Sequence, residues 1–152
     1  MLIDISTHLP CAPNVVIEHV DSPQLLLHVA KPMVRFVALE PPHFPVKWAD
    51  GTYSVSMYLF GLVPMGRQAV VISHPHADVF TLRDNGHSAM IPTWDHVITI
   101  AAAGSGTLYR DRLIIRAGLL TPFVWLFALL FYHHRQRRWR QLVRAGFDYG
   151  IH

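Results

Sequence analysis

Residues 91–132 have the sequence IPTWDHVITIAAAGSGTLYRDRLIIRAGLLTPFVWLFALLFY, which carries most of the information about the fold. Two strand-like runs flank the Gly104-Ser105-Gly106 segment, and this arrangement is typical of a β-hairpin. If Gly104 and Ser105 form the turn, Ala103 lies opposite Gly106 and the pairing of the two strands follows. The stretch therefore predicts two long antiparallel strands followed by an apolar segment without charge.

This register divides the hairpin side chains between two faces, because successive residues of a strand point in opposite directions. The mainly apolar face holds Trp94, His96, Ile98, Ile100, Tyr109, Asp111, Leu113 and Ile115. The mostly polar face holds Thr93, Asp95, Val97, Thr99, Arg110, Arg112, Ile114 and Arg116. A shift by one residue would mix the two groups, so we expect the apolar face to contact the core.

A long helix is predicted after the hairpin. Thr121 is a suitable N-cap and Pro122 a suitable first helical residue. Helical periodicity continues to Ala145, and Gly146 fits the left-handed position that commonly follows a helix. The helical residues expected to face the sheet are Phe123, Phe127 and Leu130.

The rest of the chain predicts further strands and two short helices. A strand is expected over 2–9, helices over 13–20 and 22–30, and another strand over 33–40. From 47 to 117 strand-like runs alternate with turn signals, of which Asn85-Gly86 is a strong one. In the strand within 51–62, either the Tyr53, Val55, Met57 and Leu59 face or the Ser54, Ser56 and Tyr58 face points inward. Strands with helices on one side indicate an α+β domain.

Several motifs in this order resemble a known family. They are Trp94-Asp95-His96, Gly106-Thr107 with Asp111, the link Ala117-Gly118-Leu119, and the basic, aromatic stretch from His134 to Arg140. The chain resembles the START/Bet v 1-like (SRPBCC, helix-grip) superfamily, and within it the polyketide cyclase-like ligand-binding branch. The resemblance implies a curved seven-stranded antiparallel sheet wrapped around a long C-terminal helix, with two short helices after the first strand. We expect one helix-grip domain over 1–146 and a short tail over 147–152.

Composition excludes several other classes. With 152 residues, 51% of them hydrophobic and 15% charged, the chain fits one folded domain rather than a disordered segment. The single cysteine, Cys11, excludes an internal disulfide framework. The first residues lack the pattern of a signal peptide, and together with the lone cysteine this predicts a cytoplasmic protein.

An apolar run over 117–132 precedes a cluster of arginines, and this pattern allows an alternative. As a helix the run would extend about 24 Å, less than the ~30 Å hydrocarbon core, but the order also fits a membrane anchor. The basic residues that follow include Arg135, Arg137, Arg138 and Arg140. They fit a solvated helix end, or a contact with an anionic membrane surface; no nucleic-acid partner is expected.

The candidate chemistry centres on His96 and Asp111, which the register makes diagonal neighbours on the core-facing side. Three roles are open: a structural pair, orientation of a ligand, or acid–base catalysis by His96. Tyr109 is either a hydrogen-bond donor to a ligand or a core residue. The residues expected to line a ligand cavity are Trp94, His96, Ile98, Tyr109, Asp111, Leu113, Phe123, Phe127 and Leu130.

Eleven histidines raise the question of a metal, but no spacing matches a known ligand set. His74-Pro75-His76 resembles the H-x-H of a cupin, without the glutamate expected a few residues later. We therefore predict neither metal nor cofactor. The predicted function is binding of a small hydrophobic ligand, lipid-like or polyketide-like. Binding is favoured over catalysis because no nucleophile stands beside His96; a polyketide cyclase or dehydratase is the alternative.

Overall fold

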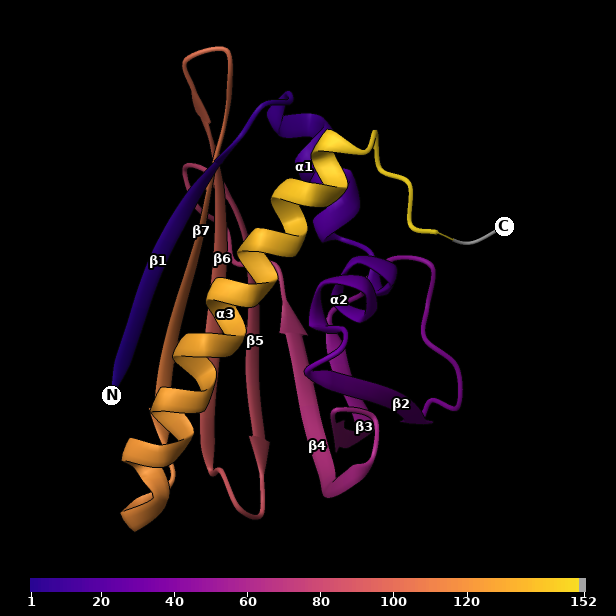
Figure 1. Cartoon of the computed structure of the whole chain (residues 1–152), viewed down its shortest axis with the longest axis vertical. Helices are drawn as coiled ribbons and strands as arrows, with labels where there is room; N and C mark the ends of the chain where they lie inside the picture. Colours follow the sequence, from indigo (N-terminus) through magenta and orange to yellow (C-terminus); the bar gives the residue numbers. More distant parts are fainter. Residues whose placement is uncertain (151–152) are drawn as a thin grey trace.

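The computed structural model describes residues 1–150 and contains one antiparallel sheet with helices on one side (Figure 1). The elements are β1 (Leu2–Leu9), α1 (Pro13–Val20), α2 (Pro23–Ala30), β2 (Val34–Glu40), β3 (Gly51–Leu59), β4 (Val63–Ser73), β5 (Phe80–Ser88), β6 (Thr93–Ala103), β7 (Gly106–Arg116), the 3₁₀ turn η1 (Gly118–Leu120) and α3 (Thr121–Arg144). The sheet order is β1-β7-β6-β5-β4-β3-β2, so all seven strands are antiparallel to their neighbours. The predicted architecture is confirmed: α3 lies across one face of the sheet, with α1 and α2 beside its C-terminal half (Figure 1).

The predicted register of the β6–β7 hairpin is also confirmed. Ala103 pairs with Gly106, and Ile98 pairs with Asp111. The expected inward side chains are buried except for Trp94, which is half-buried. Leu113, for example, has no exposed surface, whereas Arg112 on the other face is exposed. The alternation of side chains therefore predicted correctly which residues of the hairpin face the core.

The inward face of β3 is the one that carries Tyr53 and Val55, which are both buried. Met57 continues this face and packs against the core. This result settles the alternative that the sequence left open.

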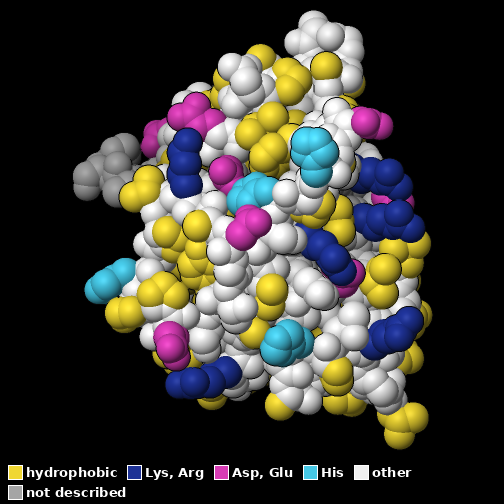
Figure 2. Space-filling view, turned by 180° about the vertical axis from the view of Figure 1, so that it is seen from behind, with side chains coloured by type: hydrophobic (Ala, Val, Ile, Leu, Met, Phe, Trp, Pro, Cys, Tyr) yellow, Lys and Arg dark blue, Asp and Glu magenta, His cyan; other side chains and the backbone are white. Residues whose placement is uncertain are grey.

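The outer face of the sheet, seen from behind in Figure 2, shows acidic and basic side chains interspersed among neutral ones. Two ion pairs on outward positions account for part of this pattern. Arg83 of β5 binds both carboxylate oxygens of Asp95 at 2.9 Å, and Arg110 of β7 pairs with Asp4 of β1. Neither sign of charge dominates this face.

The turn predicted at Asn85-Gly86 is wrong, because both residues lie inside β5. Asn85 pairs with Asp95 and Gly86 with Trp94, and the β5–β6 connection comes later, at residues 89–92. Glycine is required here for another reason. A Cβ at position 86 would lie 2.9 Å from the carbonyl oxygen of Ala69, so Gly86 allows β4 to approach closely.

The start of α3 lies one residue before the prediction, with Leu120 rather than Thr121 as N-cap. The Thr121 hydroxyl accepts a hydrogen bond from the Ala117 N–H at 2.9 Å and donates one to the Gly118 carbonyl at 2.7 Å. It therefore closes the preceding 3₁₀ turn instead of capping α3. Gly146 has the predicted left-handed conformation, with φ 67°.

The stripe of α3 that faces the sheet differs from the prediction. Phe123 and Leu130 are 74% and 58% exposed, and only Phe127 of the expected three is half-buried. The buried residues are Ala128, Phe131, Tyr132, Arg135, Gln136, Trp139 and Leu142. Their spacing of three and four places one stripe toward the sheet, and Phe123 and Leu130 lie outside it.

No helix within residues 1–150 is both long enough and apolar enough to cross a membrane. In the segment 117–132, Ala128, Phe131 and Tyr132 are buried against β7 residues such as Leu113 and Ile115. The last turn of this apolar segment therefore contributes to the protein core.

Residues after α3 also pack on the protein. The Phe147 ring stacks on His19 of α1 with centroids 4.1 Å apart, and the Tyr149 hydroxyl lies 2.6 Å from His19 Nδ1. These contacts cover the end of the core where α1 meets α3.

Candidate functional site

A cavity lies between the middle of the sheet, α2 and α3. The centre of a water molecule can move through about 90 Å³ of it, and one water needs only about 10–15 Å³ on this measure. The cavity is therefore large enough for an organic molecule. The residues that line it are Val20, Leu25, Leu26, Val34, Phe36, Trp48, Met57, Gln68, Val70, Ile72, Leu82, Asp84, Ile91, Trp94, His96, Ile98, Phe127, Phe131, Tyr132 and Arg135.

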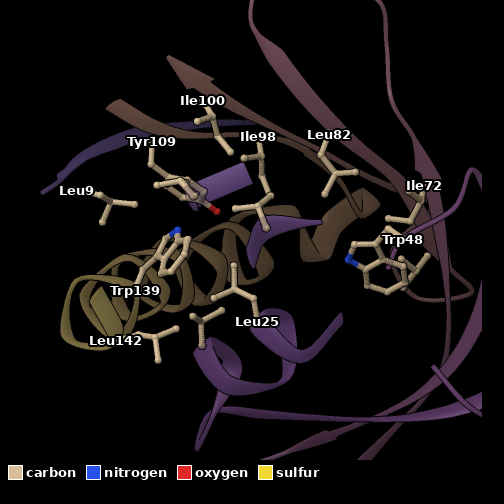
Figure 3. Close-up of a cluster of buried hydrophobic side chains, with 14 of the residues drawn as sticks. Leu9, Leu25, Trp48, Ile72, Leu82, Ile98, Ile100, Tyr109, Trp139 and Leu142 are labelled. Atoms are coloured by element: carbon tan, nitrogen blue, oxygen red, sulfur yellow. The ribbon is translucent and has the colours of Figure 1, made fainter. Parts of the chain in front are cut away.

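The cavity wall is mainly apolar and continues into the main core. In Figure 3, Tyr109 and Trp139 lie side by side at one end of this core, Trp48 lies at the other, and Leu25 of α2 lies between them. The Tyr109 and Trp139 rings meet edge to face with centroids 6.1 Å apart. Aromatic packing thus closes one end of the space between sheet and helices.

Four strongly polar side chains interrupt the apolar wall: Gln68, Asp84, His96 and Arg135. Asp84 of β5 pairs directly with His96 of β6. His96 in turn contacts Asp111 of β7. We call Asp84, His96 and Asp111 the polar row, because they cross three neighbouring strands below α3.

Asp111 is the most fully satisfied member of the polar row. Its Oδ1 accepts hydrogen bonds from His96 Nε2 at 2.7 Å and from the Tyr109 hydroxyl at 3.1 Å. Its Oδ2 accepts one from Gln136 Nε2 at 3.0 Å. Burial alone would raise the pKa of Asp111, but His96 first, and then the charge of Arg135 and the Gln136 hydrogen bond, hold that pKa below its usual range. Asp111 is therefore a carboxylate.

His96 is neutral and oriented by Asp111. Burial lowers the pKa of His96 below its usual range, against the opposing effect of Asp111. Because a carboxylate can only accept, Nε2 carries the proton and Nδ1 the lone pair. The ring edge packs on Tyr132 with centroids 4.8 Å apart.

Asp84 replaces a backbone contact in the β4–β5 ladder. Its Oδ1 accepts the Val71 N–H at 2.9 Å, at a point where the regular pairing of these strands is interrupted. Burial raises the pKa of Asp84 to about 7, although the Val71 N–H and the charge of Arg135 oppose this effect. The carboxyl group therefore changes protonation near neutral pH.

Arg135 is not the surface residue that its basic segment indicated. It is 7% exposed, lines the cavity, and lies over the Tyr132 ring at 4.9 Å from the centroid. The other arginines of this segment, which the sequence assigns to a solvated helix end or to a membrane contact, differ from it. Arg138 and Arg140 are half-buried and bind the His28 carbonyl and the Thr7 hydroxyl, while Arg137 is exposed.

The structure brings together only part of the predicted ligand-lining set. Trp94, His96, Ile98 and Phe127 line the cavity. Tyr109, Asp111 and Leu113 are buried but do not line the cavity, and Phe123 and Leu130 are exposed on α3. The diagonal contact predicted for His96 and Asp111 is confirmed by the hydrogen bond between them.

The H-x-H segment has a different role from metal binding. His74 Nε2 lies 2.7 Å from Asp21 Oδ1, and His74 Nδ1 contacts Asp50. Both nitrogens therefore face acceptors and carry protons, so the ring joins the α1–α2 turn to the start of β3. Among residues 1–150, no group of three or more His, Cys, Asp or Glu side chains is arranged to hold a metal ion.

No family model matches the chain, and no curated protein matches its sequence. Solved structures match its fold closely. A START superfamily protein from Mycobacterium smegmatis has a TM-score of 0.65 and 12% identity, covering 95% of this chain and 97% of its own. The Bet v 1-type allergen Ara h 8.0201 has a TM-score of 0.66 and 9% identity over 95% and 98%. This chain has the helix-grip fold of the START/Bet v 1-like superfamily.

A third helix-grip structure, an Aha1 dimer from Colwellia psychrerythraea, gives a TM-score of 0.66 with 8% identity. It covers 97% of this chain and 99% of its own. At such low identity the agreement establishes the helix-grip fold itself. The chemistry of the site must therefore be derived from the side chains of this chain.

The residues that sequence reasoning missed are mainly Gln68, Asp84, Tyr132 and Arg135. Asp84 lies two residues from buried Leu82 in β5, so strand alternation points to its inward position. Arg135 follows Phe131 and precedes Trp139 at helical spacing, so periodicity gives the same signal. The arginine cluster around it concealed this pattern.

Proposed function

We propose that this protein binds a small hydrophobic ligand in the cavity between the sheet, α2 and α3. The observation that carries the proposal is a mainly apolar cavity whose wall includes a few convergent polar groups. Such a wall removes an apolar ligand from water, while the polar groups fix its orientation. The helix-grip resemblance, which implies a ligand cavity in this position, supports the same conclusion.

The direct test uses the neutral fluorophore N-phenyl-1-naphthylamine, whose emission increases in apolar surroundings. We expect saturable binding by the full chain. The Ile98→Trp substitution places a larger side chain in the cavity wall and should weaken binding by about tenfold or more. Leu130→Trp adds the same side chain at an exposed position of α3 and should leave binding unchanged.

The far-ultraviolet circular dichroism of both variants must match the wild type for this comparison to hold. Absence of binding by the wild type contradicts the proposal, as does equal binding by both variants. Native mass spectrometry of gently purified protein gives an independent result, for which we expect a one-to-one small-molecule adduct.

Acid–base catalysis by His96 on a polyketide-like substrate is a second candidate. The observation in its favour is that a neutral histidine, oriented by a carboxylate, lines the cavity. Turnover of a linear aromatic polyketide analogue, lost in His96→Gln while fluorophore binding remains, would establish catalysis. Equal loss of stability and binding in that variant would instead assign His96 a structural role.

A further inference from the structure

Arg135 is a buried cation that the protein leaves without an ionic partner. It takes part in none of the ion pairs formed by residues 1–150, and its Nε has no hydrogen-bond partner there. Its guanidinium carbon lies over the Tyr132 and Phe131 rings, at 4.9 and 5.8 Å from the centroids, and Tyr132 helps to stabilise its charge. A guanidinium stays charged at all relevant pH values, and its burial is costly unless an anion binds it.

The two nearby carboxyl groups do not supply that anion directly. Asp111 already accepts hydrogen bonds on both oxygens, from His96, Tyr109 and Gln136. Asp84 accepts the Val71 N–H and forms no ion pair with Arg135. Both act on Arg135 only through their electric fields. The guanidinium thus borders the cavity with donors available for a bound molecule.

We propose that the cavity selects an amphipathic monoanion, a carboxylate at the end of an apolar body, and that Arg135 binds its head group. This inference rests on the proposed function and adds the chemical class of the ligand. The carboxylate would neutralise the buried Arg135 guanidinium, and the apolar body would lie against Leu25, Leu82 and Ile98.

A carboxylate fits this environment better than a doubly charged phosphate. Its two oxygens match the planar donor fork of one guanidinium. A second negative charge would have no further cation in the cavity wall and would face the Asp84 carboxyl group. Because Asp84 has a pKa of about 7, it adds only a fraction of a charge against a monoanion at neutral pH. Gln68, which also lines the cavity, carries an amide N–H group as a further donor.

The test compares decanoate with 1-decanol, which share a chain length and differ in charge. Each competes with N-phenyl-1-naphthylamine for the full-length protein at pH 7, where decanoate is ionised. We expect decanoate to bind at least about tenfold more tightly than decanol, equivalent to 1.4 kcal/mol. Arg135→Met keeps an unbranched apolar side chain without the charge and should remove this preference while changing decanol affinity less than about threefold.

Arg137→Met is the matched control, because Arg137 is exposed on the same helix. Both ligands should bind this variant as they bind the wild type. Arg135→Lys should retain part of the preference for decanoate. If Arg135→Met does not fold, the comparison of Arg135→Lys with the wild type tests the role of Arg135 instead. Equal affinity of the wild type for the two ligands overturns the anion proposal but leaves the proposed function standing. Retention of the preference in folded Arg135→Met overturns the role of Arg135, and failure to bind the fluorophore overturns both proposals.

Discussion

The two halves of α3 differ in how the polarity of their side chains relates to burial: exposed apolar side chains occur in the first half and buried polar ones in the second. The first half, up to Leu130, is the more apolar, yet Phe123 and Leu130 expose 74% and 58% of their surface. The second half carries the arginines, yet Arg135 and Gln136 are only 7% and 3% exposed. Local hydropathy is therefore a poor guide to which side chains of this helix are buried, and both parts of α3 reach the cavity, through Phe127 in the first and Arg135 in the second.

The second half is held on both sides by polar side chains. Toward β1, Gln136 donates to the Ile5 carbonyl at 3.0 Å and Arg140 to the Thr7 hydroxyl at 3.0 Å. Toward α2, His134 donates to the Lys31 carbonyl at 2.6 Å and Arg138 to the His28 carbonyl at 3.1 Å. These bonds fix the helix above the polar row, where a ligand-binding group must be held in a constant position. The basic segment thus has a positioning role that its composition alone does not reveal.

Among the substitutions considered, removal of the Gln136 amide should produce the largest loss of folding stability. Gln136→Leu leaves the buried Asp111 Oδ2 and the partly buried Ile5 carbonyl without their donor. We expect the free energy of unfolding to fall by about 2–4 kcal/mol, as measured by urea denaturation. Gln141→Leu, at an exposed position of α3, should change it by less than about 0.5 kcal/mol. Equal values for the two variants would mean that the Gln136 hydrogen bonds do not hold the second half of α3 in place.

The Asp84→Asn substitution, which changes the charge opposite Arg135, should alter the free energy of unfolding by a smaller amount that depends on pH. The folded pKa of Asp84 is about 7, against an ordinary value of 3.8. Between these values the folded state binds more protons, so the contribution of Asp84 to stability falls as pH rises through this window. Asn keeps an acceptor for the Val71 N–H and does not ionise. We therefore expect the free energy of unfolding of Asp84→Asn to exceed that of the wild type by about 1 kcal/mol at pH 8, equivalent to about 2–4 °C in Tm. At pH 4 the two proteins should be almost equally stable.

The control for this experiment is chosen from the charged and titratable groups around Asp84. They are Arg135 on α3, His96 opposite on β6, and Asp95, the outward neighbour of His96. Asp95→Asn changes the charge of that neighbour on the outer face and should not reproduce the gain. A gain for Asp84→Asn that is the same at pH 4 and pH 8 would assign it to packing instead of charge.

Much of the fold could be predicted because its signals are local and periodic. Alternation fixed both faces of the β6–β7 hairpin, and a turn at Gly104-Ser105 defined its register. The same register predicted the contact between His96 and Asp111, which lie on neighbouring strands. Seven strands and a long final helix then followed from the resemblance that these motifs support.

The errors came from signals that depend on tertiary packing. Asn85-Gly86 is a strong local turn signal, but at Gly86 the close approach of β4 is what requires glycine. Arg135 looks like part of a solvated helix end until the position of the sheet is known. Its burial depends on rings and strands far away in sequence, so composition assigns it to the surface. The candidate site was thus predicted at Trp94, His96, Ile98 and Phe127, and missed at Gln68 and Asp84 of the sheet and at Tyr132 and Arg135 of α3.

Substitutions in the apolar half of α3 should have the smallest effect on folding stability and on ligand affinity. Phe123→Gln and Leu130→Gln, made together, replace exposed apolar side chains with one that favours helix formation. Because little apolar area is lost from the core, the free energy of unfolding should change by less than about 1 kcal/mol, and fluorophore affinity should stay within twofold. Thermal denaturation and fluorescence titration measure the two quantities. A loss above about 2 kcal/mol would mean that these side chains are covered in solution, and the contrast between the two halves of α3 would then apply only to the polar residues.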